Sequence, residues 1–185
     1  MIIMISIVLF RRLRMIRVLN ETDTKAFYEL TCEAFQLHPF AFVHEINERS
    51  NYTERDIAQV LHPKNHHLQI FFGAFDDDTL VGFVQLNFFP YSSKSHKATV
   101  QGLYVKPEYR GQQIGRALME TLIAYAHQKG IEQLVLAVAS NNIAAKVFCD
   151  HLGFEFLALE IHARKFNNKY VDEHWLVYYF DKEYV

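Results

Sequence analysis

The sequence predicts an α/β protein with one mixed sheet of about seven strands and helices on both faces. Three observations support this prediction. The chain has 185 residues, 50% of them hydrophobic, which is enough for one well-filled core and too little for two ordinary domains. Apolar patterns of strand and helix period alternate along the chain. The segment 134–138 is wholly apolar, as expected for a strand covered on both faces.

The first predicted strand, 16–19, leads into a helix. Thr22 or Asp23 can cap this helix, because their side-chain oxygens accept hydrogen bonds from the first free backbone N–H groups. Apolar residues then recur at helical spacing, namely Phe27, Leu30 and Ala34.

A second helix and a hairpin follow. Thr53 and Asp56 resemble a capping box at the start of this helix, and Pro63 ends it. Strands are predicted over 68–75 and 80–89, and a polar turn of three aspartates and a threonine joins them as a hairpin.

The second half alternates strands with two more helices. A strand over 99–105 precedes a helix over about 113–129, which Gly130 terminates. One face of that helix is apolar, with Ile114, Ala117, Leu118, Leu122 and Tyr125. After the strand 134–138, Asn141 or Asn142 caps a helix that ends before Gly153. Its inward residues are predicted to be Ala145, Phe148 and Leu152, and strands 154–166 and 170–180 complete the sheet.

Composition restricts the class of partner and the compartment. The formal net charge is -2, and charged residues make up 22% of the chain, so no basic excess indicates a nucleic acid or an anionic membrane as partner. Cys32 and Cys149 lie far apart without metal-type or redox-type spacing. This favours reduced thiols and a cytoplasmic protein.

The first 14 residues differ from the rest of the chain and are considered separately from the domain. An apolar run precedes three arginines, but it is too short for a membrane span, which needs about 20 residues, and it lacks the flanks of a signal peptide. We expect 1–14 to be an extension outside the fold and 15–185 to be the domain. A membrane-surface anchor is the alternative interpretation of 1–14.

The most informative segment lies between the predicted strand 99–105 and the following helix. After Pro107, Arg110 and Gly111 begin a loop, and Gly115 stands in the first turn of the helix. Backbone N–H groups that lead into a helix N-terminus form an anion site, and glycine lets phosphates approach closely. Arg110 and Arg116 add positive charge. The spacing matches neither a P-loop nor a dinucleotide-binding fingerprint, so we predict a pyrophosphate site, with an ordinary turn as the alternative.

A second segment about thirty residues later gives the loop a family context. The loop, R-G-Q-Q-I-G at 110–115, resembles the R/Q-x-x-G-x-G/A loop of the GNAT superfamily of N-acetyltransferases. Residues 142–154 resemble the second motif of that family, N-x-x-A-x-x-x-Y-x-x-x-G-F. The resemblance covers essentially 15–180, and it implies a twisted, mostly antiparallel sheet of about seven strands and acetyl-CoA as co-substrate.

The resemblance also implies roles for individual residues. The pyrophosphate would be held by backbone N–H groups of Gly111, Gln112, Gln113, Ile114, Gly115 and Arg116. The Leu103 N–H would meet the acetyl carbonyl, and Val105 would pair with the pantetheine arm. Asn142 and Phe148 would line the other side of that arm. The strands that end near 105 and 140 would splay apart and hold the thioester in the gap.

Two positions depart from the family pattern. Gln113 replaces a glycine of the loop, and Cys149 replaces the tyrosine that usually protonates the leaving thiolate. Cys149 is therefore a candidate acid, and a small buried hydrophobe is the alternative. A covalent cysteine intermediate is disfavoured because no His–Asp pair is recognisable beside it.

The general base and the acceptor contacts are less defined. The segment 97–106 contains no carboxylate, so candidates for a base acting through water are His96, His174 and Glu173. Candidate acceptor contacts are Glu45, Glu48, Tyr170 and Trp175. The histidines His62, His66 and His67 are interpreted as a solvated loop, and no metal site is predicted.

Together these features predict transfer of an acetyl group from acetyl-CoA to a primary amine by direct attack in a ternary complex. A small-molecule acceptor is slightly favoured. A protein lysine or N-terminal acetyltransferase and a non-catalytic acyl-CoA-binding module are the alternatives, and a homodimer is left open.

Overall fold

A single seven-stranded sheet forms the centre of the molecule. The computed structural model describes residues 15–38, 53–166 and 168–181. The strand order is β1-β2-β3-β4-β5-β7-β6. The strands are β1 Met15–Val18, β2 Gln69–Asp76, β3 Thr79–Phe88, β4 Lys97–Val105, β5 Gln133–Ala139, β6 Glu155–Phe166 and β7 Lys169–Tyr179. Neighbours are antiparallel except β4 and β5, which run parallel. The predicted mixed, mostly antiparallel sheet is confirmed.

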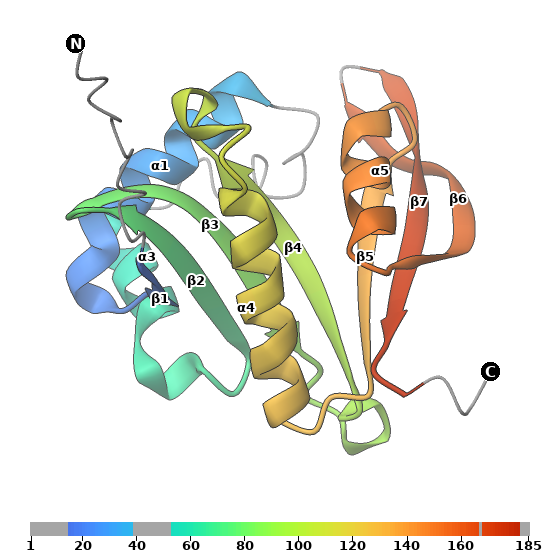
Figure 1. Cartoon of the computed structure of the whole chain (residues 1–185), viewed down its shortest axis with the longest axis horizontal. Coiled ribbons are helices and arrows are strands. Elements are labelled where there is room, and N and C mark those ends of the chain that lie inside the picture. The colour runs from blue at the N-terminus through green and yellow to red at the C-terminus, as the bar shows by residue number, and fades with distance from the viewer. Residues whose placement is uncertain (1–14, 39–52, 167, 182–185) are drawn as a thin grey trace, which may run out of the picture.

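Helices cover both faces of the sheet. The helices of the described part are α1 Thr24–Leu37, α3 Glu54–Leu61, α4 Ile114–Gln128 and α5 Ile143–His151. In Figure 1, α4 and α5 lie in front of the sheet, and α1 and α3 lie behind it. We call these the α4 face and the α1 face. Phe71 packs on the α1 face, whereas its neighbours Ile70 and Phe72 pack on the α4 face, as alternation along a strand requires.

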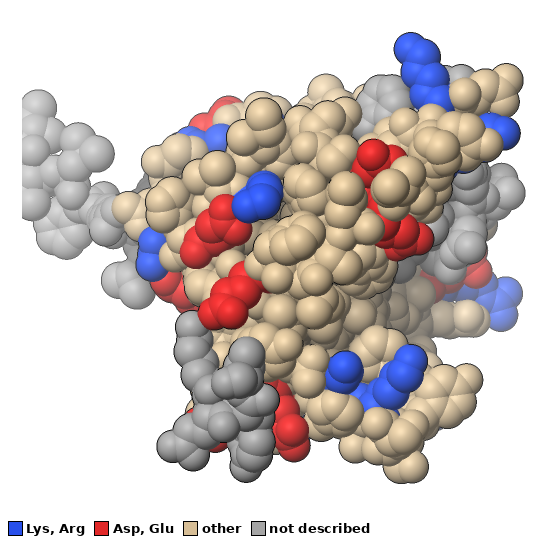
Figure 2. Space-filling view, turned by 90° about the vertical axis from the view of Figure 1, so that its right-hand side faces the viewer, with Lys and Arg blue, Asp and Glu red and all other residues tan. Residues whose placement is uncertain are grey.

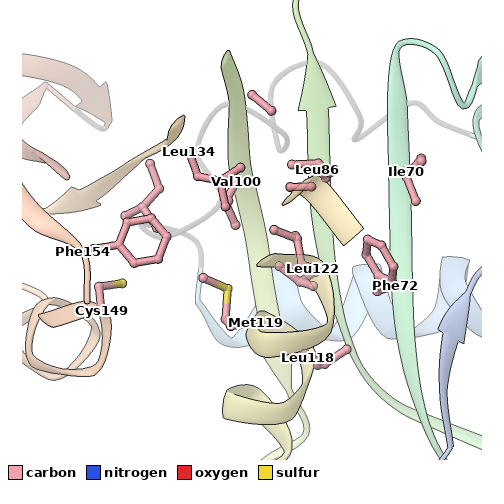
Figure 3. Close-up of a cluster of buried hydrophobic side chains, with 14 of the residues drawn as sticks. Ile70, Phe72, Leu86, Val100, Leu118, Met119, Leu122, Leu134, Cys149 and Phe154 are labelled. Carbon is pink, nitrogen blue, oxygen red and sulfur yellow. The ribbon is translucent and has the colours of Figure 1, made fainter. Parts of the chain in front are cut away.

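The larger core lies between the sheet and α4. Met119 and Leu122 are at most 1% exposed and pack on Val100 and Phe72 of the strands. Figure 3 shows these side chains converging between α4 and the sheet. The apolar stripe predicted for this helix is therefore the surface that fixes α4, and with it the loop in front of α4, to the sheet.

Helix starts follow local capping, with one correction. The Thr53–Asp56 capping box is present as predicted. At the first helix, however, the Asp23 side chain makes no cap, and Thr22 is not the capping residue either. The side chain of Asn20 caps a short 3-10 turn, Glu21–Asp23, that leads into α1. The Asp23 carboxylate accepts the Asn20 N–H, which completes a capping box at this turn, and it also forms an ion pair with Arg17 of β1.

Element boundaries shift by one or two residues from the predictions. β1 begins at Met15 and ends at Val18, and β4 begins two residues earlier than predicted, at Lys97. α4 begins at Ile114, because Gln113 adopts a left-handed conformation with φ 62° and ends the preceding loop. In α5 the buried residue is Cys149, and the residues predicted to point inward, Ala145, Phe148 and Leu152, are only partly buried.

Exposed apolar side chains concentrate at the β6 edge of the sheet. Ile143, Val147, Phe156, Leu157, Leu159 and Ile161 are all exposed and belong to α5 and β6. Figure 2 looks onto this side of the molecule and shows mainly uncharged residues. Patches of this kind commonly mark interaction sites, and the homodimer stays a prediction. Of the helices described, none combines the length and the apolar character needed to cross a membrane.

Candidate active site

The sheet opens between its two parallel strands. β4 and β5 pair through Lys97–Gln133, Ala98–Leu134 and Thr99–Val135. β4 then continues to 105 and β5 to 139 without further pairing between them. Figure 1 shows the two strands meeting at one end and diverging toward the other. The predicted splay is therefore present, and a gap of about 160 Å³ lies between the strands.

A β-bulge lies where β4 borders the gap. Gly102 and Leu103 together oppose the single residue Val84 of β3, and Gly102 has φ 62°. A bulge leaves one residue outside the regular ladder and redirects the backbone. The bulge can thus turn a backbone N–H of β4 toward the gap, at the position where the Leu103 N–H is predicted to act.

The predicted phosphate loop has the backbone of an anion site. After the 3-10 turn Pro107–Tyr109, both Gly111 (φ 71°) and Gln113 (φ 62°) adopt left-handed conformations before α4 begins. Gln113 occupies the N-cap position, and its side chain makes no capping hydrogen bond. The first N–H groups of α4 have no acceptor within the helix and carry partial positive charge. They are therefore suited to bind an anionic ligand.

A cavity of about 750 Å³ extends from this loop to the gap. Its lining includes the predicted cofactor residues Leu103, Val105, Arg110, Gly111, Gln113, Ile114, Gly115, Arg116, Asn142 and Phe148. Leu103, Asn142 and Phe148 also line the gap, so the two spaces adjoin. The structure thus brings these ten residues together, and their contact with a cofactor stays a prediction.

The eleventh predicted residue, Gln112, lies outside the lining of the cavity. Its side-chain amide donates to the backbone carbonyl of Glu108 at 3.1 Å. The guanidinium of Arg116 also has an internal partner, because its Nε lies 2.7 Å from Oε1 of Glu120 one helical turn later. Gln112 can therefore serve a ligand through its backbone N–H, and Arg116 presents a charge that Glu120 partly offsets.

Cys149 lies in the core rather than at the surface of the cavity. Its side chain is 5% exposed and borders the gap beside Met119. Figure 3 shows it directed into the cluster that contains Met119 and Phe154. Burial, and secondarily the charge of Asp150, raises the pKa of the thiol to about 12. A thiol with this pKa is a poor proton donor to a thiolate of pKa about 8.5, which favours the buried-hydrophobe alternative.

The three candidate bases lie in different places. His96 precedes β4, and its carbonyl accepts from Glu132 and Gln133 at the closed end of the strand pair. His174 packs edge-on against Phe156. Glu173 pairs with Ala139 at the last rung of β5, at the open end of the gap. Position therefore favours Glu173 among the three.

Two predicted acceptor contacts lie in β7, and both have internal partners. The ring of Tyr170 stacks on His162 with 4.3 Å between the ring centroids. The indole N–H of Trp175 donates to Glu160 at 2.7 Å. Glu45 and Glu48 lie outside the described residues, as does the predicted extension 1–14. Contact with an acceptor stays a prediction for these four residues.

The histidine cluster 62–67 makes local hydrogen bonds. Nδ1 of His62 accepts the Lys64 N–H at 3.0 Å, and Nδ1 of His67 lies 2.7 Å from the Lys64 carbonyl. Within 15–38, 53–166 and 168–181, no group of three His, Cys, Asp or Glu side chains is arranged to hold a metal ion.

Sequence reasoning missed several residues that border the site, and His38 and Arg164 are two of them. His38, at the C-terminal end of α1, lines the large cavity, and Arg164 of β6 lines the gap. Both reach the site from elements far away in the chain, and neither belongs to a local motif. A sequence without an alignment carries no signal that could have found them.

Comparison with known proteins identifies the family. The domain model of the GNAT acetyltransferases matches residues 16–175. Spermidine N(1)-acetyltransferase of Thermoplasma acidophilum is 32% identical over 108 residues, which are 58% of this chain and 64% of that protein. Mycothiol acetyltransferase of Geodermatophilus obscurus is 27% identical over 146 residues, which are 78% of this chain and 45% of that protein. The matches thus span less than two thirds of these relatives.

Solved structures share the fold over almost the whole chain. A Staphylococcus epidermidis protein assigned as an acetyltransferase superposes with a TM-score of 0.77 at 34% identity, covering 91% of this chain and 99% of that one. A Salmonella typhimurium protein solved with acetyl-CoA has a TM-score of 0.79 at 19% identity, covering 93% and 96%. The split sheet, the loop before α4 and these matches together show that the chain belongs to the GNAT acetyltransferase family.

Proposed function

We propose that this protein is an N-acetyltransferase that moves an acetyl group from acetyl-CoA to a primary amine by direct attack in a ternary complex. The observation that carries this proposal is the continuity of the site. One cavity leads from the N-terminus of α4, along Val105 and Leu103, into the gap between β4 and β5. Acetyl-CoA has an anionic end, an extended arm and a thioester, and these three parts fit the three regions in that order.

The chain's own groups would act on the cofactor in the following way. Backbone N–H groups from Gly111 to Arg116 bind the pyrophosphate, and the helix dipole favours its charge. Val105 aligns the arm along β4, and Phe148 covers it from α5. The N–H of Leu103, at the bulge, donates to the acetyl oxygen, where negative charge develops during attack. The cofactor itself supplies the activated acetyl group and the thiol leaving group.

A small-molecule acceptor is favoured by the narrow gap through which the acetyl group would be presented and by the relatives of this chain. The gap measures about 160 Å³, so a compact amine can approach the acetyl group more easily than a bulky one. Relatives named for small acceptors include the spermidine enzyme and a bovine thialysine N-epsilon-acetyltransferase that is 40% identical over 73 residues. An Escherichia coli ribosomal-protein alanine N-acetyltransferase, 40% identical over 58 residues, supports a protein acceptor as the second candidate.

A charge test at Gly115 examines the cofactor loop. A Cβ at Gly115 would lie 3.8 Å from Phe148 and Val105, which is an ordinary contact, so the position has room for a Cβ. Gly115→Asp adds negative charge beside the expected phosphates, and Gly115→Asn adds nearly the same shape without charge. By calorimetry we expect Gly115→Asp to weaken CoA binding at least about 10-fold relative to Gly115→Asn.

Two outcomes would count against the proposal in different ways. Equal CoA affinity of the two Gly115 variants would refute the placement of the pyrophosphate. Tight CoA binding without release of free thiol, across a panel of amines, would instead identify a non-catalytic acyl-CoA-binding module.

A further inference from the structure

The gap between β4 and β5 is neutral except at one place. Backbone and uncharged side chains form most of its lining, and Arg164 of β6 is the charged side chain that reaches it in the described part of the chain. The guanidinium of Arg164 forms an ion pair with the carboxylate of Glu173 on β7. The two side chains are 12% and 5% exposed, so both charges are buried at the edge of the proposed reaction site.

A second bulge brings the pair together. In the β6–β7 ladder, Glu160 pairs with Glu173 and Arg164 pairs with Val171. The three residues 161–163 therefore lie opposite Asp172 alone, and the Asp172 carboxylate accepts the His162 N–H at 2.8 Å. Without these extra residues, Arg164 would pair with a different residue of β7 and would not have its present position beside Glu173. The irregular strand thus places Arg164, which lines the gap, beside the carboxylate of Glu173.

The pair lies on the side of the sheet opposite the cofactor cavity. Leu176 and Tyr178 of β7 pack in the core on the α4 face. Because side chains alternate along a strand, Glu173 points toward the α1 face. It also stands opposite Ala139, at the open end of β5. An acetyl group that passes through the gap from the α4 face would emerge beside these two charges.

Stability alone does not account for a buried pair at this location. Removing two charges from water costs about as much as their attraction returns, and apolar replacements of buried pairs are often neutral or stabilising. A ligand that carries the opposite charges, however, gains from such a pair, because charge-assisted hydrogen bonds in a dry site are strong.

We propose that Arg164 and Glu173 select the acceptor, and that the preferred acceptor is an α-amino acid acetylated on its α-amine. Glu173 binds the α-ammonium group and accepts one of its protons, and Arg164 binds the neighbouring carboxylate. The neutral amine then forms the N–C bond as the C–S bond of acetyl-CoA breaks, and its second proton leaves with the CoA thiolate as the free thiol. The charged groups of Arg164 and Glu173 are in contact with each other. One acceptor can therefore bind both only if its own amine and its own anionic group are separated by a similarly short distance. An α-amino acid meets this condition, whereas a diamine, an ω-amine or a peptide N-terminus does not. This inference rests on the proposed function.

Matched substrates test the selection. Initial rates of thiol release are compared for phenylalanine, phenylalaninamide and phenethylamine, and for leucine, leucinamide and isoamylamine, at saturating acetyl-CoA. We expect kcat/KM for each acid to exceed that for its amide by about 10- to 100-fold, as one charged hydrogen-bond pair allows. Arg164→Gln should bring this ratio near one, while Lys165→Gln, which removes the adjacent exposed cation of β6, should leave it unchanged.

The ratio is measured within each variant, so a partly unfolded preparation does not alter it. If Arg164→Gln fails to fold because Glu173 is left unpaired, the double variant Arg164→Gln/Glu173→Gln removes both charges and should give the same ratio near one. A wild-type ratio near one, or a ratio that survives both variants, overturns the inference. Rapid acetylation of amides or peptides but not of acids also overturns it and leaves the proposed function intact. Absence of turnover with all amines, despite CoA binding, overturns the proposed function itself.

Discussion

Nη2 of Arg110 lies 2.8 Å from Nε2 of His38 and joins the start of the loop before α4 to the end of α1. The same guanidinium donates from Nε to the carbonyl of Val105 at 3.0 Å. Because an arginine N–H can only donate, His38 accepts at Nε2, and the neutral ring carries its proton on Nδ1. The arginine of the loop motif therefore orders the loop through two elements that border the cavity.

This contact predicts a shift in the pKa of His38. Burial lowers that pKa, and the charge of Arg110 lowers it further. Arg110→Gln should therefore raise the pKa of His38, which NMR titration of the ring can measure. Arg116→Gln is the control, since Arg116 is bound to Glu120 and should leave His38 unchanged. Because folding lowers the pKa of this histidine, the protein loses stability as the pH falls below the ordinary histidine pKa of about 6.5. Arg110→Gln should therefore reduce this loss of stability at low pH.

The left-handed residue before α4 predicts a stabilising substitution. Gln113 has φ 62° at the N-cap, a conformation that costs a non-glycine residue about 1 kcal/mol or more. Gln113→Gly should raise the free energy of unfolding by about 0.5–1 kcal/mol, or Tm by about 2–3 °C. Gln112→Gly is the control, because Gln112 is not among the residues with positive φ, and it should give no gain. A lower Tm for Gln113→Gly would contradict this account.

The two cysteines should differ sharply in reactivity. The pKa of the Cys149 thiol is raised to about 12, chiefly by burial, so only about one molecule in 10,000 carries the reactive thiolate at pH 8. Cys32 is only partly buried. Iodoacetamide followed by peptide mapping should label Cys32 and spare Cys149. Cys149→Ala should also leave turnover unchanged, and a large fall in kcat would restore its role as the acid.

Acid sensitivity should arise in part from Asp23. Burial works to raise the pKa of this carboxyl, but hydrogen bonds from Arg17 and from the Asn20 N–H outweigh burial and lower it. The two Arg17 bonds are 2.6 and 2.7 Å long. A carboxylate whose pKa is lowered on folding stabilises the protein above its ordinary pKa of about 3.9 and loses that contribution as pH falls through the folded value.

Asp23→Asn removes this contribution. We expect it to reduce the free energy of unfolding at pH 7 by about 2 kcal/mol, as measured with urea. The difference from the wild type should shrink toward pH 3. A constant difference across that pH range would show that Asp23 acts through packing and not through its charge.

Local features of this fold could be predicted from the sequence, and long-range ones could not. The Thr53–Asp56 capping box and the loop around Gly111 depend on neighbours within a few residues, and both were found. The pairs Arg110–His38 and Arg164–Glu173 join elements through the tertiary fold, and the second depends on a strand irregularity that has no glycine or proline to mark it. Such contacts are set by the packing of the whole sheet.

The pairing of β4 and β5 is the short parallel step in an otherwise antiparallel sheet. Only three rungs connect the half that carries β1 to β4 with the half that carries β5 to β7. The open ends of these two strands have no ladder hydrogen bonds to each other, so we expect their separation to adjust when a ligand binds. A ligand wedged between them bridges both halves, so occupancy should slow amide hydrogen exchange on both sides of the seam together.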